Sequence, residues 1–369
     1  MPSPATLICA FKLRSRFHFA WKHSTLAAMT ALHLLGSAAN GGAETYFVEL
    51  TAALHSAKIG TVCALRGHAG RELALAKDGV MGQRLLFGGP LDVFTRFQVA
   101  ALARLSGAKA LVAWMNRAAR HTPPGPWKRI GRLGGYYKLK NYRGFDMLVA
   151  NTQDIADWAV KEGWPADHIR YIANFAAAKS SPPQDRASLD TPADAPVLLT
   201  LGRLHSVKAQ DVAIAALTAI PGAYLWIAGA GPLEAELKAQ AARLGVADRV
   251  RFLGWRADAG ALYAAADVCL FPSRYEPLGN VVIQAWAHGL PVIAAASQGP
   301  SALIRDGKDG VLVPIDDAKA LAEAALRLIG DKALRTELSA TGLQRVADEF
   351  SQNAVVAKWR ALFDEMGVL

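Results

Sequence analysis

The chain has 369 residues, of which 52% are apolar, so it can form two domains of ordinary size with a core in each, and wholesale disorder is excluded. Its 41 Lys and Arg outnumber its 31 Asp and Glu, and the charge of +10 favours a negatively charged partner such as nucleic acid, anionic lipid or a phosphorylated glycan. The sequence has no apolar run of about 18 residues, which predicts no transmembrane helix, and its three scattered Cys indicate reduced thiols rather than disulfides or a metal site.

The first 28 residues differ from the rest of the chain. They carry Lys and Arg but no acidic residue, and their apolar patches are too brief for a secretory signal. We therefore predict a basic leader over residues 1–28, either a disordered arm or an over-extended start. Met29 is followed at once by an apolar run that ends at Leu35, which predicts that the folded part begins at Met29 with a core strand.

A glycine-rich turn connects this strand to the first predicted helix. Gly41-Gly42-Ala43-Glu44 leads into a helical pattern that continues through Leu54, and such a turn lets the backbone approach an anion closely. The alternative is a tight turn whose Glu44 is favoured by the helix dipole. The turn is not a dinucleotide fingerprint, because its glycine spacing differs and the next strand, residues 61–65, is followed by Arg66 instead of an acid for a ribose.

Residues 117–143 form a basic segment with eight Lys or Arg and no Asp or Glu. The segment follows the next clear strand, residues 110–114, and contains prolines and interleaved aromatic residues. We predict a loop that binds an anion, with Lys138, Lys140 and Arg143 as acceptor-binding residues. The alternatives are a solvated face and an RNA-binding surface, although no RNA-binding motif accompanies the charges. His121 is predicted to be a loop histidine rather than a catalytic one.

The α/β alternation restarts after residues 179–196, a Pro-, Ser- and Ala-rich stretch that we predict to be a domain linker. In the loop after a strand at residues 197–201, Arg203 and Lys208 can converge on one diphosphate. The loop after a strand at residues 268–271 contains Glu276, which can accept hydrogen bonds from hydroxyls. It leads into a helix predicted from Asn280 to His288. A further core strand is predicted at residues 224–228.

Two of these loops resemble the donor-site motifs of glycosyltransferase family 4. Gly202-Arg203-Leu204, three further residues and Lys208 match one motif, and Glu276-Pro277-Leu278-Gly279 with a polar residue eight positions after the Glu matches the other. The resemblance extends from about Met29 to the C-terminus. It implies the α/β GT-B fold, in which two Rossmann-like domains face each other across a cleft, and a retaining enzyme that uses a nucleotide sugar.

The chain departs from the family pattern at several positions. Gln284 replaces the second Glu, which in the family holds the ribose diol, and a Gln lacks the charge-assisted strength of a carboxylate. Donor affinity or nucleotide preference is therefore expected to differ. Trp114-Met115-Asn116 stands where many family members carry a histidine near the reacting centre, so no catalytic histidine is carried over. Ala209 and Ala302 replace a Gly and a Glu of the pattern.

The resemblance implies a role for each matched position. Arg203, Lys208 and Glu276 would be the catalytic residues, with the two cations stabilising the departing diphosphate. No catalytic metal and no other cofactor is implied. The donor-binding residues would be Gly41, Gly42, Gly202, Gly229, Gly231, Gly254, Leu278, Gly279, Asn280 and Gln284.

The same resemblance implies a domain order. An acceptor-side domain would span residues 29–178 and a nucleotide-sugar-binding domain residues 197–350, with the linker at 179–196 between them. A C-terminal helix, residues 351–369, would return to the first domain.

The order of the motifs looks most like bacterial lipopolysaccharide-core glycosyltransferases. The implied reaction moves a hexosyl unit from a nucleoside diphosphate sugar to a lipid-linked or phosphorylated glycan. It would occur in the cytoplasm at the inner face of the cytoplasmic membrane, with peripheral contact to anionic lipid and without nucleic acid. Two alternatives remain open: a GT-B nucleotide-sugar epimerase, and a non-enzymatic basic protein that binds RNA or a membrane through residues 117–143.

Overall fold

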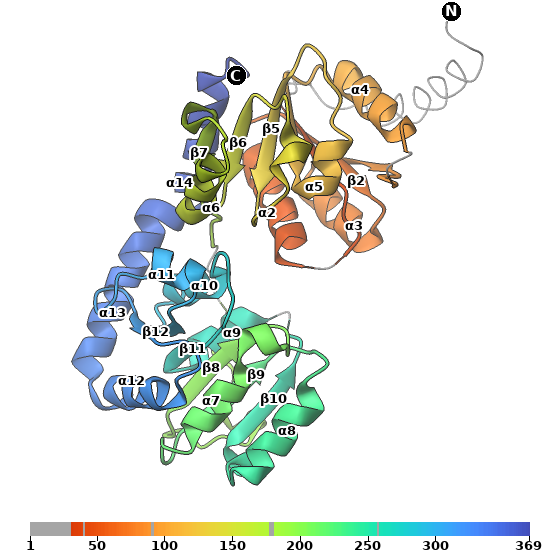
Figure 1. Cartoon of the computed structure of the whole chain (residues 1–369). Coiled ribbons are helices and arrows are strands. Elements are labelled where there is room, and N and C mark those ends of the chain that lie inside the picture. Colours follow the sequence, from red (N-terminus) through yellow and green to blue (C-terminus); the bar gives the residue numbers. More distant parts are fainter. Residues whose placement is uncertain (1–30, 40, 90–91, 177–180, 257) are drawn as a thin grey trace, which may run out of the picture.

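The computed structural model describes residues 31–369, apart from residues 40, 90–91, 177–180 and 257. The predicted leader and the predicted start at Met29 therefore lie outside the described residues. The described chain forms two parallel β-sheets, one in each half of the sequence, and helices cover both (Figure 1). None of the helices in this part of the chain is long and apolar enough to cross a bilayer.

The first sheet consists of β1 (Ala31–Leu35), β2 (Thr61–Arg66), β3 (Met81–Leu85), β4 (Ala110–Trp114), β5 (Lys128–Leu133), β6 (Met147–Ala150) and β7 (Ile169–Tyr171). Its strands are all parallel and lie in the order β3-β2-β1-β4-β5-β6-β7. Every residue of β1 and β4 is buried, because helices cover both faces of the sheet. These helices are α2 (Gly42–Ser56), α3 (Ala69–Lys77), α4 (Phe94–Ser106), α5 (Met115–Arg120) and α6 (Gln153–Lys161).

The second sheet repeats this plan with β8 (Val197–Leu201), β9 (Tyr224–Ala228), β10 (Val250–Gly254), β11 (Val268–Phe271), β12 (Val292–Ala295) and β13 (Val311–Val313). The strands lie in the order β10-β9-β8-β11-β12-β13, again all parallel. The two predicted Rossmann-like domains are thus confirmed. The helices of this half are α7 (Gln210–Leu217), α8 (Glu234–Arg243), α9 (Ala259–Ala265), α10 (Asn280–Ala287), α11 (Gln298–Leu303), α12 (Ala318–Gly330) and α13 (Lys332–Arg345).

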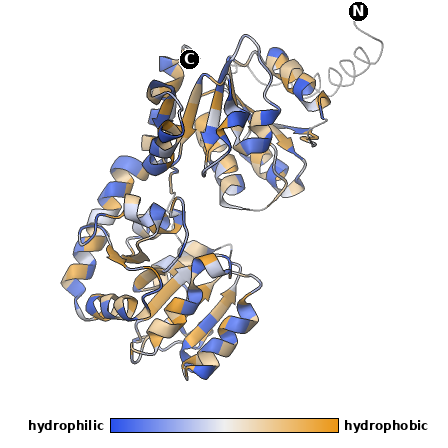
Figure 2. Cartoon of the chain, viewed as in Figure 1, coloured by the Kyte–Doolittle hydropathy of each residue, from blue (hydrophilic) through white to orange (hydrophobic). Residues whose placement is uncertain are grey.

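Each sheet has a hydrophobic cluster on both of its faces. Figure 2 shows the consequence in the ribbon: the strands are mostly hydrophobic, while the helices carry bands of both kinds. A helix that packs on a sheet with one face and meets water with the other requires this banding. Apolar side chains fill both faces of each sheet, so a polar ligand site is expected at the ends of the strands.

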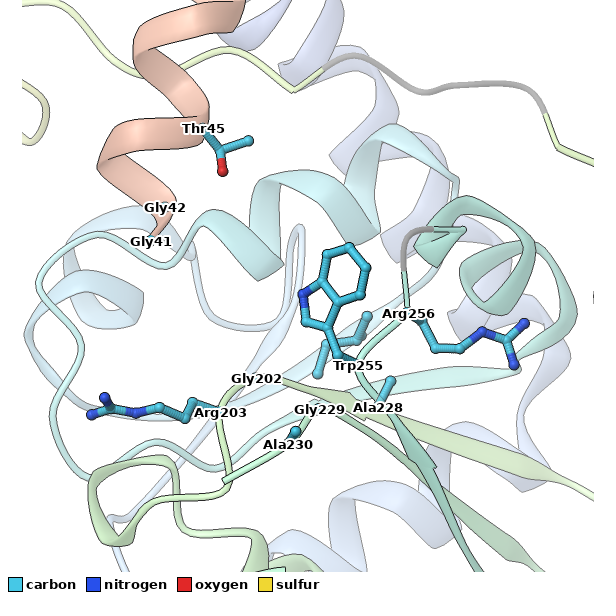
Figure 3. Close-up of a pocket in the computed structure, with 11 residues that line it drawn as sticks. Gly41, Gly42, Thr45, Gly202, Arg203, Ala228, Gly229, Ala230, Trp255 and Arg256 are labelled. Atoms are coloured by element: carbon cyan, nitrogen blue, oxygen red, sulfur yellow. The ribbon is translucent and has the colours of Figure 1, made fainter. Parts of the chain in front are cut away.

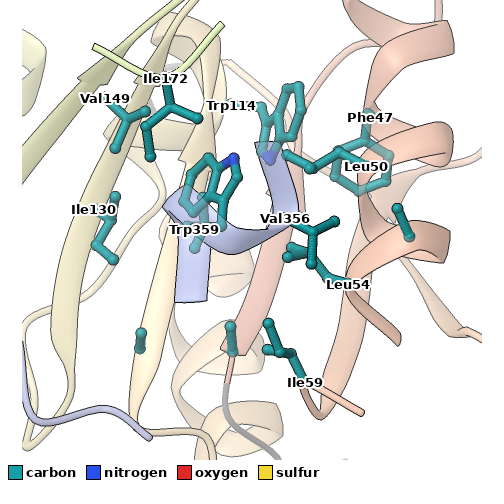
Figure 4. Packing of buried hydrophobic residues seen from close by; sticks show 14 of the residues in the cluster. Phe47, Leu50, Leu54, Ile59, Trp114, Ile130, Val149, Ile172, Val356 and Trp359 are labelled. Atoms are coloured by element: carbon teal, nitrogen blue, oxygen red, sulfur yellow. The ribbon is translucent and has the colours of Figure 1, made fainter. Parts of the chain in front are cut away.

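The last helix, α14 (Gln352–Glu365), returns to the first sheet. Its Val355, Val356 and Trp359 belong to the same buried cluster as Phe47 and Trp114 (Figure 4). Complete burial of one such side chain stabilises a fold by about 1.5–3 kcal/mol. Arg360 adds a hydrogen bond to the Ala57 carbonyl oxygen (2.7 Å), so the C-terminal helix fastens the second half of the chain to the first.

The basic segment 117–143 is not a loop, and that part of the prediction is wrong. It contains most of α5 and the interior strand β5, which pairs with β4 and β6. Gly131 lets the Tyr142 ring pack directly on this strand, since an added Cβ would lie 2.5 Å from Tyr142 Cδ1. Arg132 is buried and donates to Asn174 Oδ1 (2.7 Å), and burial lowers its pKa to about 10. Part of this charge is therefore structural.

The predicted linker packs against the second sheet where the structure describes it. Gln184 N donates to the Ala261 carbonyl oxygen (2.9 Å), and Arg186 Nη2 donates to the Ala265 carbonyl oxygen (2.7 Å) and to Asp267 (3.0 Å). These contacts hold residues 184–196 beside α9 and the start of β11. We propose that the second domain includes them, rather than beginning at residue 197.

Candidate functional site

A cavity of about 870 Å³ lies between the two sheets, at the carboxyl ends of β8, β9 and β10. The carboxyl ends of parallel strands are where doubly wound sheets bind ligands. In Figure 3, the N-terminal end of α2 lies above the strand ends of the second sheet, so both halves of the chain contribute to the cavity. Its lining residues are Gly41, Gly42, Thr45, Leu201, Gly202, Arg203, Ala228, Gly229, Ala230, Trp255 and Arg256.

Three glycine-containing strand ends form the floor of this cavity. Gly202 N donates to the Ala228 carbonyl oxygen (3.0 Å), and Gly229 N donates to the Gly254 carbonyl oxygen (2.7 Å). A Cβ on Gly229 would lie 1.9 Å from the Gly202 carbonyl oxygen, and one on Gly231 would lie 2.3 Å from the Leu204 carbonyl oxygen. The absence of side chains at these positions lets the three strand ends join into one surface.

The two predicted catalytic cations are placed differently. Arg203 lines the cavity, is exposed, and its side chain has no hydrogen-bond or ion-pair partner among the described residues. Lys208 instead forms an ion pair with Glu276, and its Nζ lies 5.7 Å from the centre of the Phe271 ring. Glu276 Oε1 also accepts a hydrogen bond from Gly279 N (3.3 Å). The structure therefore brings Lys208 and Glu276 together, although neither lines the cavity.

The predicted donor residues at the start of α10 lie at the contact between the two halves. Asn280 Oδ1 accepts from Asn174 Nδ2 (3.3 Å), and a Cβ on Gly42 would lie 3.8 Å from Asn280 Nδ2. Gly279 precedes the helix with a φ of 82°, a left-handed conformation that favours glycine. Leu278 beside it is buried.

Gln284 is held by a neighbouring helix. Its Oε1 accepts a hydrogen bond from the Tyr263 hydroxyl (3.2 Å), and Tyr263 stacks on His288 at 4.9 Å. Burial raises the pKa of Tyr263 well above its usual value, so the phenol stays protonated and remains a donor. Gln284 does not line the cavity, and a contact from its amide to a ribose stays a prediction.

The predicted acceptor residues Lys138, Lys140 and Arg143 are exposed, and none lines this cavity. Lys140 lies within a 3₁₀ turn (Leu139–Tyr142), and Lys138 and Arg143 flank it. The turn packs on α5, where Asn141 Nδ2 donates to Asn116 Oδ1 (2.9 Å). His121 is buried at the end of α5, where it lies 3.6 Å from Asp92. Lys138, Lys140 and Arg143 have no ion-pair partner among the described residues, and they lie apart from the cavity.

The sequence analysis did not single out Trp255, which is 76% exposed although it is a large apolar residue. Figure 3 shows its indole rising from the floor of the cavity toward Thr45, while Arg203 and Arg256 point to opposite sides. Arg256 Nη2 donates to Gln184 Oε1 (2.7 Å), which holds the loop after β10. In the sequence, the feature that could have indicated this role is the position of Trp255, an aromatic residue directly after the glycine that ends β10.

His, Cys, Asp and Glu do not form a cluster suited to a metal ion within the described part of the chain. His33 in the centre of β1 accepts from the Trp114 indole (3.3 Å), and burial lowers its pKa to about 3. It is therefore neutral and serves packing in the core. The groups that a ligand in the donor cavity can contact include its backbone amides, its cations and the exposed indole of Trp255.

The sequence of residues 195–331 matches the family described as glycosyl transferases group 1. Two proteins of Rhizobium meliloti named lipopolysaccharide core biosynthesis glycosyltransferases are similar over nearly their whole length. LpsE is 37% identical over 320 residues, which cover 86% of this chain and 94% of LpsE. LpsD is 35% identical over 327 residues, which cover 88% of this chain and 95% of LpsD.

The structure is similar to that of Anabaena HepE, which was solved in complex with UDP. The TM-score is 0.81 at 21% sequence identity, and the alignment covers 91% of this chain and 100% of HepE. A likeness at this level of identity concerns the fold alone. It confirms the predicted GT-B fold.

Proposed function

The chain belongs to the group 1 glycosyltransferases, and we propose that it moves a hexosyl unit from a nucleoside diphosphate sugar to a lipid-linked glycan such as a lipopolysaccharide core, with retention of anomeric configuration. The acceptor class is suggested by LpsE and LpsD, which are named for lipopolysaccharide core biosynthesis. The single observation that supports a nucleotide-sugar donor is the cavity at the ends of β8, β9 and β10, which Arg203 lines without a side-chain partner among the described residues. HepE, whose fold is similar, was solved with UDP.

The proposed chemistry uses the charges around this cavity. Departure of the nucleoside diphosphate places negative charge on the phosphates, and Arg203 can meet that charge with a planar fork of donors. Lys208 is 25% exposed and Glu276 is 14% exposed, so they form a partly buried pair that a bound donor can reorganise. Glu276 would then accept from sugar hydroxyls while Lys208 turns to the diphosphate.

The proposal is tested by incubating the purified protein with a panel of nucleotide sugars, with and without a lipopolysaccharide-core acceptor. Hydrolysis, epimerisation and transfer are measured separately, and NMR of the product gives the anomeric configuration. Transfer with retention is expected. Epimerisation without an acceptor would support the epimerase instead, and inversion would refute the proposed stereochemistry.

We expect Trp255→Ala to weaken nucleotide diphosphate binding at least fivefold, because the exposed indole can stack on the base of the donor. Base stacking on an aromatic side chain contributes about 1–3 kcal/mol. Isothermal titration with UDP and GDP measures the loss and compares the two bases. Trp255→Phe is the matched control and should retain most of the affinity, since it keeps an aromatic face. Unchanged binding by Trp255→Ala would place the base elsewhere.

We further propose that the protein contacts the inner face of the cytoplasmic membrane peripherally. Lys138, Lys140 and Arg143 are exposed and have no ion-pair partner within the described ranges. Leu86, Phe94 and Phe97 are exposed by 68%, 75% and 72%, with exposed Arg96 between the two phenylalanines. Thr95 Oγ1 accepts from Phe87 N (3.1 Å), which holds Leu86 beside the start of α4. Exposed aromatic side chains accompanied by cations suit an anionic lipid surface.

We expect simultaneous reversal of Lys138, Lys140 and Arg143 to Glu to reduce binding to anionic vesicles and to raise the KM of a lipid-linked acceptor. Nucleotide binding should hardly change, because the donor is held by the other domain. The difference from wild type should shrink with salt, since exposed charges are screened over about 10 Å at 0.1 M. The control reverses Lys319, Arg327 and Lys332, three exposed cations of α12 and α13, by the same total charge. If both triple variants change vesicle binding and acceptor KM equally, then Lys138, Lys140 and Arg143 are solvated surface charges without a specific role in membrane binding.

A further inference from the structure

A second cavity, of about 350 Å³, opens at the carboxyl end of the first sheet. Its walls include Ser37 after β1, Arg66 at the end of β2, and Asn116 and Arg117 after β4. The neighbouring strands β1 and β4 form the point where the strand order reverses direction, because β2 and β3 lie on one side and β5 to β7 on the other. Ligands of doubly wound sheets bind at this switch point.

Two arginines give this cavity its charge. The Arg66 side chain has no hydrogen-bond or ion-pair partner within the described residues. Arg117 is fixed in place: its Nη1 donates to the Phe87 carbonyl oxygen (3.2 Å), and its stem packs under Gly36, where an added Cβ would lie 2.9 Å from Arg117 Cγ. The remaining N–H groups of Arg117 have no hydrogen-bond partner among the residues that the structure describes, so a ligand can accept from them. The guanidinium groups of Arg66 and Arg117 can each donate two parallel hydrogen bonds to an anion such as a carboxylate or a phosphate.

The acidic groups of the adjoining elements already have partners. Glu44 accepts from the Ser37 hydroxyl (2.5 Å) and interacts electrostatically with Arg71, whereas Glu72 is paired with Arg84 (2.8 Å). Arg71 also donates to the Ser37 and Ala39 carbonyl oxygens (2.9 and 2.7 Å), which fixes the wall after β1. The positive charge of Arg66 and Arg117 is therefore without an acidic partner in the part of the chain that the structure describes, and an anion would supply one.

The chain is strained at the rim of this cavity. Met115, the residue that follows β4, has a φ of 62°, which side chains other than glycine rarely adopt. Such conformations cost about 1–3 kcal/mol and concentrate at ligand sites. Met115 itself lines the cavity and precedes Asn116 and Arg117. The unusual turn thus sits directly before two of the polar side chains that a ligand would meet.

We propose that this cavity binds an anionic group of the acceptor, a phosphate or a sugar carboxylate, between Arg66 and Arg117. The assignment of that group to the acceptor rests on the proposed function. Residues 36–39 line this cavity, and Gly41 and Gly42 line the donor cavity, so the two ligands would contact residues that are close in the sequence. Lys138, Lys140 and Arg143 would serve the lipid surface, and the two arginines would position the glycan.

Direct binding tests the site without turnover. Glycerol 1-phosphate and glucuronate are titrated into the full-length protein saturated with UDP, and binding is followed by ligand-observed NMR, with glycerol and glucose as neutral probes. Arg66→Gln should weaken binding of the preferred anion at least tenfold, and Arg66→Lys should recover part of it. Arg84→Gln is the charge-matched control, because Arg84 lies on the neighbouring strand and is already paired. The preferred anion tells whether the natural group is a phosphate or a carboxylate.

Two results would overturn the proposal. One is equal anion affinity of Arg66→Gln and Arg84→Gln. The other is an affinity that falls in Arg203→Ala but not in Arg66→Gln, which would assign the probes to the donor cavity. Failure of the proposed function has a different signature: no nucleotide sugar would support transfer, while anion binding at Arg66 would persist. With a transfer assay in hand, Arg66→Gln should raise the KM of an anionic acceptor at least tenfold with little change in kcat.

Discussion

Arg203→Ala and Lys208→Ala should each lower turnover at least tenfold while the fold survives. Removing a hydrogen bond to a charged group costs about 1.5–3 kcal/mol, and about 1.4 kcal/mol of lost transition-state stabilisation is already a factor of ten in rate. Arg203 lines the donor cavity without a partner among the described residues, so its loss should affect the ligand rather than the protein. Steady-state kinetics with the preferred nucleotide sugar, together with the melting temperature, separates the two effects.

The Lys208 variant should show a further effect, because it leaves Glu276 without its cation. The carboxylate is 14% exposed and would keep only its hydrogen bond from Gly279 N among the contacts described for it. We therefore expect Lys208→Ala to lower kcat more than Lys208→Arg, which preserves the charge. Lys238→Ala removes an exposed ion pair with Glu234 on α8 and is the matched control. Near-normal transfer by both Arg203→Ala and Lys208→Ala would refute the assignment of the donor site.

The strands that the sequence predicts well are those with an uninterrupted apolar run. β4, β8, β9 and β11 have the predicted bounds, because burial on both faces favours apolar side chains along the whole strand. β5 was missed because Lys128, Arg129 and Arg132 interrupt its pattern. The first two lie toward the start of the strand, and Arg132 is accommodated inside by Asn174. Buried charge that is compensated by a distant residue cannot be recognised from local periodicity.

Contacts between residues that are distant in the sequence also limit what can be predicted for the donor cavity. Loop glycines and Arg203 could be placed beside a ligand in advance, since they directly follow core strands and the ends of parallel strands converge. The ion pair between Lys208 and Glu276 joins residues 68 positions apart, and neither partner indicates the other. The exposure of Trp255 and the absence of a partner for Arg66 are likewise properties of the surrounding structure. Pairing and exposure must therefore be read from the fold, even where residue types already suggest the chemistry.

Gly229→Ala should weaken donor binding more than the loss of either cation. The new Cβ would lie 1.9 Å from the Gly202 carbonyl oxygen, a backbone atom that cannot rotate away. The ends of β8 and β9 would have to separate, which moves Gly202 and Arg203 and stretches the hydrogen bond from Gly229 N to the Gly254 carbonyl oxygen. Overpacking of this kind typically costs about 1–3 kcal/mol of stability. We therefore expect UDP affinity to fall at least thirtyfold and the melting temperature to drop by several degrees.

Gly245→Ala is the control that separates stability from the site. Gly245 follows α8 with a φ of 68°, and an added Cβ there would meet nothing within 4 Å. An alanine in this left-handed conformation costs about 1–2 kcal/mol. The melting temperature of Gly245→Ala should therefore fall about as far as that of Gly229→Ala. The UDP affinity of Gly245→Ala, titrated well below the melting temperature of both variants, should stay at the wild-type value. If Gly229→Ala binds UDP as tightly as Gly245→Ala does, the three joined strand ends are not the surface on which the diphosphate lies.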